Sequence, residues 1–116
     1  MRPFHRRFVL SACLLAAALA APATALAAWP AQPLRIVVPY SAGGSSDLIA
    51  RALATEMGQE LGQSVVVDNK PGASAMLGAE LVARAAPDGY TLLLADVPHV
   101  INGSLYKTRY DAIKDF

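Results

Sequence analysis

Three short apolar runs, separated by segments of helix length, constrain the fold of this chain more than any other feature of its sequence. The runs are residues 34–38, 64–68 and 90–95, and they are rich in Val, Ile and Leu, which favour β-strands. The segments between them, near 47–61 and 74–86, have the apolar spacing of helices. Strands joined by helical crossovers are parallel, and such crossovers are right-handed. We therefore predict an α/β fold with an open parallel sheet in the strand order 2-1-3.

The same pattern bounds the individual elements. The first helix is predicted to begin near Asp47, behind a Ser45 or Ser46 cap, and to end at Gly62. The third strand is nearly all apolar, so we expect it to be buried on both faces and to be the best candidate for the central position. A weaker, short helix is expected near 102–106. The apolar stripe of the first helix is predicted at Ile49, Ala52, Leu53, Met57 and Leu61.

Residues 1–27 have the composition of a secretory signal peptide. They contain three Arg and no acidic residue, and an apolar stretch follows the charged start. This stretch is shorter than the roughly 20 residues that a membrane-spanning helix needs. The small residues of Ala25-Leu26-Ala27 fit a signal-peptidase site, so we predict cleavage before Ala28 and export to the periplasm. Two alternatives stay open, a twin-arginine signal at Arg6-Arg7 and lipidation at Cys13.

The rest of the chain, residues 28–116, is predicted to form the folded part. It carries seven basic and nine acidic residues, a net charge of −2, without the basic excess of a nucleic-acid-binding protein. It contains no Cys, so packing alone would stabilise it in an oxidising compartment. Three strands are few for a complete sheet. We therefore expect these residues to be a fragment of a larger domain.

The loops after the strands are the candidate ligand-binding segments, because open parallel sheets bind ligands beyond the carboxyl ends of their strands. The loop after the first strand, 40–47, contains Gly43-Gly44 and two serines at a helix start. Free N–H groups at such a start favour an anion such as a carboxylate. An equally compatible alternative is that the glycines only make a tight turn and the serines only cap. The loops at 69–74 and 96–102 are the other candidates.

Enzymatic motifs fit these loops poorly. The glycines are not followed by the Lys-Ser/Thr of a phosphate loop, and the third glycine of a dinucleotide fingerprint is missing. Ser74 is not in a nucleophile elbow, because Met76 stands where a glycine is needed. One His, His99, and no Cys after residue 27 leave no His/Cys metal site. We therefore predict no catalytic residue, metal or cofactor; the enzyme alternative is a small periplasmic hydrolase or transferase using Ser46 and His99.

Three polar residues near the loops have competing interpretations. Asp47 is expected to hold the first loop by accepting hydrogen bonds from backbone N–H groups, and the sharper alternative is contact with the ammonium group of an amino-acid ligand. Asp96, after the third strand, is expected to be a solvated or capping acid. His99, beside Pro98, is expected to be a loop or capping histidine rather than a base.

Short motifs spread over residues 29–116 occur in a fixed order. The first joins Trp29-Pro30 to the strand before Pro39-Tyr40, and then to Gly43-Gly44 and Asp47. The others are Leu61-Gly62-Gln63, Val65-Val66-Val67, Asn69-Lys70-Pro71-Gly72-Ala73, Gly78-Ala79-Glu80, Ala86-Pro87-Asp88-Gly89-Tyr90-Thr91-Leu92, Ile101-Asn102, Ser104-Leu105-Tyr106 and Lys114-Asp115-Phe116. Together they resemble the Bug-type receptors, the periplasmic substrate-binding components of tripartite tricarboxylate transporters.

The resemblance implies a three-layer α/β sheet that is a partial domain of a periplasmic-binding-protein-like fold (Venus flytrap, type II). Residues 28–116 would be the N-terminal part of solute-binding domain I, in a truncated chain that lacks the second domain. A small carboxylate or related metabolite would be held in a cleft between two domains. The implied partners are this small-molecule ligand, which could also be an amino acid, and the membrane components of the transporter; the receptor would be a monomer that binds no nucleic acid. By position, the ligand-binding residues would be Tyr40, Ser41, Ala42, Gly43, Gly44, Ser46, Asp47, Ala73, Ser74, Asp96, Val97 and His99.

The chain departs from the family pattern at two of these loops. Ser41-Ala42 stands where members often have two prolines, which predicts a less rigid first loop. Asp96 stands in a loop that is commonly rich in Gly and Thr or Ser, and a carboxylate there argues against a plain polyanionic ligand. Because we expect the chain to lack the second domain, a non-functional truncated receptor is a further alternative.

Overall fold

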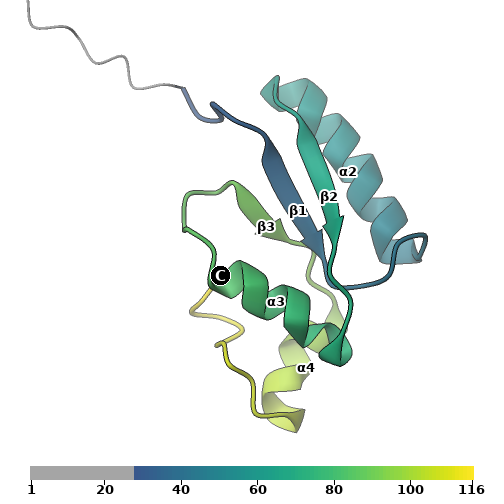
Figure 1. Cartoon of the computed structure of the whole chain (residues 1–116), viewed down its shortest axis with the longest axis vertical. Coiled ribbons are helices and arrows are strands. Elements are labelled where there is room, and N and C mark those ends of the chain that lie inside the picture. Colours follow the sequence, from purple (N-terminus) through teal and green to yellow (C-terminus); the bar gives the residue numbers. More distant parts are fainter. Residues whose placement is uncertain (1–27) are drawn as a thin grey trace, which may run out of the picture.

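The computed structural model of the chain describes residues 28–116 (Figure 1). Its strands and helices are β1 (Leu34–Val38), α2 (Ser45–Leu61), β2 (Val65–Asn69), α3 (Met76–Ala83), β3 (Thr91–Leu93) and α4 (Val97–Leu105). A short 3₁₀ turn, η1 (Ala73–Ala75), precedes α3. The predicted signal peptide, its cleavage after Ala27 and the alternatives at Arg6-Arg7 and Cys13 lie outside the described residues.

The three strands form one parallel sheet in the order β2-β1-β3, which confirms the predicted fold class and strand order. Leu34–Val38 pairs with the whole of β2, and the middle of β1 pairs with β3. β1 is therefore the central strand, and the prediction that the third strand is central is wrong for the described sheet. The side chains of β3 are half-buried rather than buried, because within residues 28–116 only β1 pairs with it.

Helices cover both faces of this sheet. α2 contacts β1 and β2, whereas α3 contacts β1 and β3, and Figure 1 shows α2 behind the sheet and α3 in front of it. The first crossover leads from β1 to β2 on one side, and the second leads from β2 past β1 to β3 on the other. Right-handed crossovers that run in opposite directions place their helices on opposite faces. The three layers therefore follow from the strand order.

The core between α2 and the sheet is built from small helix residues. Ile36 and Val38 of β1 pack against Ala50 and Ala54 of α2, and all four are buried. Val37 lies between them in the strand and therefore points to the opposite face, where it is also fully buried. Burial of both faces explains why this strand is almost entirely apolar.

The predicted apolar stripe of α2 is only partly the face that the helix buries. Met57 packs against the core cluster, but Ile49 and Leu53 are 56% and 44% exposed. Ala50 and Ala54 have the same four-residue spacing, and their small side chains allow the helix to approach the sheet closely. A pattern of large apolar residues does not distinguish these two faces, so the predicted stripe is wrong at Ile49, Ala52 and Leu53, which are exposed.

Helix α3 begins at Met76, later than the predicted start near 74. The three residues before it, Ala73–Ala75, have φ angles of 49°, 54° and 71°, and a right-handed helix cannot include left-handed residues. Further along, a Cβ added at Gly78 would stand 2.9 Å from the Pro39 Cβ and 3.1 Å from the Lys70 carbonyl oxygen. This close approach holds α3 over the ends of β1 and β2.

Helix α4 begins earlier than the short helix predicted near 102–106. Asp96 is its N-cap, and the Asp96 carboxylate accepts a hydrogen bond from the Val97 N–H at 2.6 Å. Pro98 lies in the first turn, where the missing N–H would have no helical partner. The sequence Asp-Val-Pro was therefore a helix-start signal that apolar spacing alone did not reveal.

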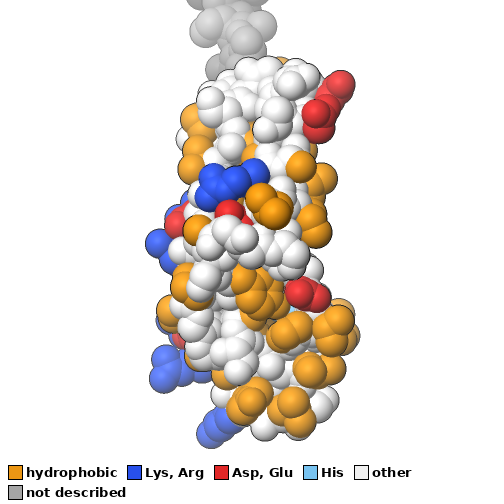
Figure 2. Space-filling model, turned by 90° about the vertical axis from the view of Figure 1, so that its right-hand side faces the viewer, with side chains coloured by type: hydrophobic (Ala, Val, Ile, Leu, Met, Phe, Trp, Pro, Cys, Tyr) orange, Lys and Arg blue, Asp and Glu red, His pale blue; other side chains and the backbone are white. Residues whose placement is uncertain are grey.

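The outward face of α4 is apolar. Val97, Val100 and Leu105 are 66%, 73% and 65% exposed. Figure 2 shows hydrophobic side chains gathered over the lower part of the molecule, where Figure 1 places this helix. Among the helices of residues 28–116, none combines the length and the hydropathy needed to cross a membrane.

Candidate functional site

Three loops meet at the carboxyl edge of the sheet, where the strand order reverses. β2 pairs with one edge of β1, and β3 pairs with the other edge. Open α/β sheets bind ligands in the crevice at such a switch point. We name the connections loop 1 (residues 39–44), loop 2 (70–75) and loop 3 (94–96). In Figure 1 the arrowheads of β1 and β2 point toward this edge.

The residues predicted for the site all fall on these loops or on the first helical turn that follows them. All are exposed except Tyr40, Ser46 and His99, which are half-buried, and Asp47, which is buried. Those in or next to loop 1 are Tyr40, Ser41, Ala42, Gly43, Gly44, Ser46 and Asp47. Loop 2 holds Ala73 and Ser74, whereas Asp96, Val97 and His99 lie at the end of loop 3 and the start of α4.

The N-terminus of α2 has no side-chain cap. Its N-cap is Gly44, so the predicted cap at Ser45 or Ser46 is wrong. The helix already begins at Ser45, which places both serines inside the first turn rather than before it. The Leu48 N–H donates to the Gly44 carbonyl at 3.0 Å, so the N–H groups before Leu48 precede the first helical hydrogen bond. These N–H groups belong to the first turn of α2, which directly follows loop 1.

A buried carboxylate, Asp47, holds loop 1 to the sheet. Its Oδ2 accepts hydrogen bonds from the Gly43 backbone N–H at 2.8 Å and from the Arg51 Nε at 3.0 Å. Its Oδ1 accepts from the Asn69 Nδ2 at 3.0 Å, and the same Nδ2 donates to the Tyr40 carbonyl at 3.1 Å. The Asp47 side chain is 4% exposed. We call this set of contacts the Asp47 clasp.

The clasp also fixes the charge of Asp47. The Arg51 side chain, the Gly43 N–H and the Asn69 amide, in that order, lower the pKa of the Asp47 carboxyl from 3.8 to about 2, and burial acts in the opposite direction. Asp47 therefore stays ionised, and it accepts the backbone N–H bond expected from the sequence. The alternative role, contact with a ligand ammonium group, would need the oxygens that the clasp already occupies.

Loop 2 contains an uncommon left-handed turn. Gly72 has a φ of 132°, and three non-glycine residues with positive φ follow it. Such conformations cost free energy in residues with a Cβ and cluster at functional sites. The turn is held from the other side of the edge, because the Asn102 Nδ2 in α4 donates to the Ser74 carbonyl at 2.8 Å. Ser74 is exposed, whereas Asn102 is 2% exposed.

Loop 3 brings a negative charge beside loop 1. Val37 pairs with Leu93. Counting three residues onward from each of them leads to Tyr40 and Asp96, which therefore follow the two strands at the same level. Burial, and second the charge of Asp96, raise the pKa of the Tyr40 hydroxyl. That hydroxyl is buried and has no hydrogen-bond partner within residues 28–116. The prediction that Asp96 is a capping acid is confirmed by its contact with the Val97 N–H.

His99 is part of the packing between α4 and the last residues of the chain. Its Nε2 lies 3.2 Å from the Ala112 carbonyl oxygen. Its ring stacks on Tyr110 with the centroids 5.8 Å apart, and the ring of Phe116 meets it edge-on at 4.7 Å. These contacts favour a structural role for the imidazole over the role of a base.

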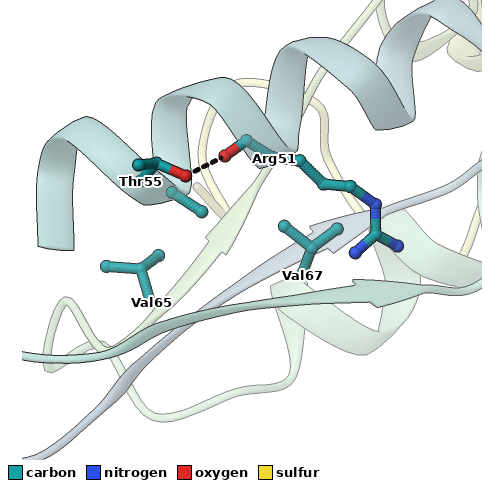
Figure 3. A pocket seen from close by; sticks show the side chains of 5 residues that line it. Arg51, Thr55, Val65 and Val67 are labelled. Atoms are coloured by element: carbon teal, nitrogen blue, oxygen red, sulfur yellow. Dashed lines mark hydrogen bonds between the residues drawn. The ribbon is translucent and has the colours of Figure 1, made fainter.

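A shallow hollow of about 270 Å³ lies beside the clasp, between α2 and β2 (Figure 3). Arg51 and Thr55 line it from the helix, and Val65 and Val67 line it from the strand. The Thr55 hydroxyl donates to the Arg51 carbonyl at 3.0 Å, the dashed line in Figure 3. None of the residues predicted for the site lines this hollow.

The three polar residues that fasten the loops, Arg51, Asn69 and Asn102, were not predicted. Arg51 lies four residues after Asp47 on the same predicted helix, so this pair was within reach of the sequence. The partners of Asn69 and Asn102 depend on the tertiary fold and were not readable from the sequence. Within residues 28–116, no three His, Cys, Asp or Glu side chains are grouped so that they could hold a metal ion.

Comparison with known proteins points to one family. The model for the tripartite tricarboxylate transporter family receptor matches residues 49–116. A UPF0065 protein of Bordetella pertussis is 45% identical over 96 residues, which are 81% of this chain and 28% of that protein. The chain spans about a third of the length, 26–36%, of the curated relatives it matches.

Solved structures agree with this match. The periplasmic binding protein BugD is 51% identical with a TM-score of 0.55, over 56% of this chain and 22% of that chain. MatC from Rhodopseudomonas palustris, with bound malate, is 38% identical with a TM-score of 0.71, over 76% of this chain and 31% of that chain. The resemblance to Bug-type receptors is thus confirmed, and the family is one of receptors and not of enzymes. The chain belongs to the family of tripartite tricarboxylate transporter receptors.

Proposed function

We propose that this chain carries one side of the ligand cleft of an exported solute-binding receptor, which recognises a small organic anion for a tripartite tricarboxylate transporter. The observation that carries the proposal is the meeting of loop 1, loop 2 and the uncapped start of α2 at the switch point. Backbone N–H groups at a helix start favour a carboxylate. The malate bound to the related MatC supports a ligand of this class.

Within this proposal the loops have separate roles. Gly43 and Gly44 let the backbone approach the ligand, because neither has a side chain and both are exposed. Asp47 shapes loop 1 without touching the ligand, because its oxygens are occupied by the clasp. Direct contacts are proposed for Tyr40, Ser41, Ala42, Ser46, Ala73, Ser74, Asp96 and Val97. His99 is proposed to support them from behind, because its ring is packed against Tyr110 and Phe116.

Calorimetric titration of the chain with malate, aspartate and benzoate tests the proposal. We expect heat of binding with at least one of these carboxylates, and no heat with any of them would contradict the proposal. Ala42→Asp places a negative charge in exposed loop 1 and should abolish the heat. Ala86→Asp is the matched control, because Ala86 is also exposed but precedes β3 at the opposite edge of the sheet.

Export and processing form the second part of the proposal. Residues 1–27 would direct the chain to the periplasm and be removed before Ala28. Support comes from the charged and apolar composition of this segment and from the description of BugD as periplasmic. The intact mass of the protein recovered from the periplasmic fraction should correspond to residues 28–116. A mass that retains Cys13 with an added lipid would instead identify a lipoprotein.

Residues 28–116 are proposed to be the first part of ligand-binding domain I of a monomeric receptor that delivers its ligand to membrane components. The alternative of a non-functional truncated receptor makes a different prediction for the DNA after codon 116, where an in-frame continuation with further strand and helix patterns would argue against it. The hydrolase alternative would need His99 as a base, but the imidazole is packed against Tyr110 and Phe116.

A further inference from the structure

Two asparagine amides connect the three loops at the carboxyl edge of the sheet. Asn69 is the last residue of β2 and directly precedes loop 2, and Asn102 lies in α4, the helix that follows loop 3. Each donates a side-chain N–H to the backbone carbonyl of a loop. Asn69 donates to Tyr40 at 3.1 Å, and Asn102 donates to Ser74 at 2.8 Å.

Asn69 uses its whole amide in these contacts. Its Nδ2 donates to the Tyr40 carbonyl and to the Asp47 Oδ1, and its Oδ1 accepts from the Arg51 guanidinium at 3.4 Å. A carboxylate of the same shape could not donate either bond, and a hydroxyl could donate only one. The position therefore requires an amide, because its donors face a carbonyl and a carboxylate on one side and its acceptor faces a cation.

Asn102 holds the strained part of loop 2. Ser74 has a φ of 54° in the middle of three left-handed residues. Its carbonyl oxygen accepts the Asn102 hydrogen bond, and Asn102 is one of only two buried polar residues in 28–116, at 2% exposed. Burial of an amide costs free energy unless it is hydrogen-bonded. The burial of an asparagine in α4 is therefore explained by this contact with loop 2.

The two contacts link the three loops to one another. Through Asn69, loop 1 is fixed to the strand end from which loop 2 starts, and through Asn102, loop 2 is fixed to the helix into which loop 3 leads. We propose that Asn69 and Asn102 are positioning residues, which hold the three loops in one preformed arrangement and so raise the affinity for a small carboxylate without contacting it. The affinity part rests on the proposed function, whereas the ordering of the loops does not.

The test compares Asn69→Asp, Asn69→Ser and Asn102→Asp with the wild-type chain. Gln59→Glu is the matched control, because it makes the same amide-to-carboxylate change on an exposed position of α2. Amide hydrogen exchange is measured without ligand for residues 40–47 and 72–77, and malate affinity is followed by NMR at a temperature where circular dichroism shows each variant folded. Exchange reports local opening, and a variant with an intact spectrum is still informative if its melting temperature falls.

We expect exchange to become at least about tenfold faster in 40–47 for Asn69→Asp and in 72–77 for Asn102→Asp, with malate bound about tenfold more weakly by both. Asn69→Ser should give an intermediate effect, because one donor remains, and Gln59→Glu should behave as wild type. Unchanged exchange in both loops would overturn this inference, as would faster exchange with unchanged malate affinity. If the wild-type chain binds no malate while exchange responds as expected, the loop ordering stands and the choice of ligand fails.

Discussion

At the scale of single residues, the side chains around loop 1 act mainly on the backbone. Asp47 accepts three hydrogen bonds from three separate segments, namely loop 1, its own helix and the end of β2. The carboxylate is nearly buried, yet its charge is balanced by Arg51 at 3.0 Å. A carboxylate with these partners fixes the position of the Gly43 N–H and leaves the neighbouring helix N–H groups for a ligand.

Acid should therefore weaken the folded chain through Asp47. The pKa of this carboxyl is lowered from 3.8 to about 2 in the folded chain, so its ionised form favours folding. The contribution is fully present above about pH 4 and is lost as the pH falls toward 2. Urea unfolding at pH 5, 4, 3 and 2 should show a steeper loss of stability for the wild-type chain than for Asp47→Asn, which has no proton to take up.

The control for this series is Asp88→Asn. Asp88 is exposed and accepts only the Tyr90 N–H, two residues away, so its removal should leave the steep acid dependence in place. Equal acid dependence of the Asp47→Asn variant and the wild-type chain would show that the clasp does not hold an ionised carboxylate.

The residues of the clasp differ in how far the sequence revealed them. The role of Asp47 was predictable, because a carboxylate in the first turn after a glycine-rich loop has backbone N–H groups close by. Arg51 lies four residues further on one helix and was within reach of the same reasoning. Asn69 was not, because it lies 22 residues away from Asp47 and meets it only through the register of β1 and β2.

At the scale of elements, one glycine fixes how α3 lies on the sheet. Gly78 is buried, and a Cβ there would meet the ring of Pro39 at 2.9 Å and the Lys70 carbonyl at 3.1 Å. Backbone and a rigid proline ring cannot move aside as a flexible side chain could. Loops 1 and 2 are both anchored at this contact, so the packing of α3 sets their separation.

Gly78→Ala should accordingly lower the free energy of unfolding by about 1–3 kcal/mol, as in other overpacked cores. Gly103→Ala is the matched control, since no atom lies within 4 Å of a Cβ there. In α4 that alanine should raise the stability by about 0.5–1 kcal/mol through its helix propensity. Denaturant unfolding monitored by circular dichroism measures both, and a stabilised Gly78→Ala variant would contradict the close approach.

Two substitutions at the start of α4 distinguish the capping role of Asp96 from the effect of its charge. Asp96→Ala should cost about 1 kcal/mol through loss of the N-cap, whereas Asp96→Asn should keep the cap and most of the stability. Both variants remove the negative charge, so both should lower the pKa of the Tyr40 hydroxyl, which Asp96 raises. NMR titration of the Tyr40 ring checks the second effect. An unchanged Tyr40 pKa in both variants would show that Asp96 does not lie close enough to the hydroxyl to affect it.

Elements whose limits are set locally were predicted well, and those set by tertiary contacts were not. β1 was bounded correctly at Leu34–Val38, because a β-branched run is closed by Pro39. α2 ends where Gly62 adopts a φ of 63°, as a C-terminal glycine predicts. The start of α3 was placed too early, because the left-handed turn before it is held by Asn102 from a distant helix.

At the scale of the whole molecule, the strand order decides where a ligand can bind. The order β2-β1-β3 puts α2 and α3 on opposite faces and brings loops 1, 2 and 3 to one edge. The apolar outer face of α4 lies at the same end of the molecule (Figures 1 and 2). This arrangement was predictable as a fold, but the fastening of the loops to one another required the structure.

The most direct test of this account is an NMR titration of the ¹⁵N-labelled chain with malate. If the loops recognise a carboxylate, saturable shifts should be confined to the amides of loops 1, 2 and 3 and the starts of α2 and α4, with Gly43, Gly44 and Ser74 among them. Amides at the opposite edge, such as that of Ala86, should not move. The absence of saturable shifts, or shifts centred on the hollow of Arg51 and Thr55 instead, would contradict the assignment of the loops as the ligand site.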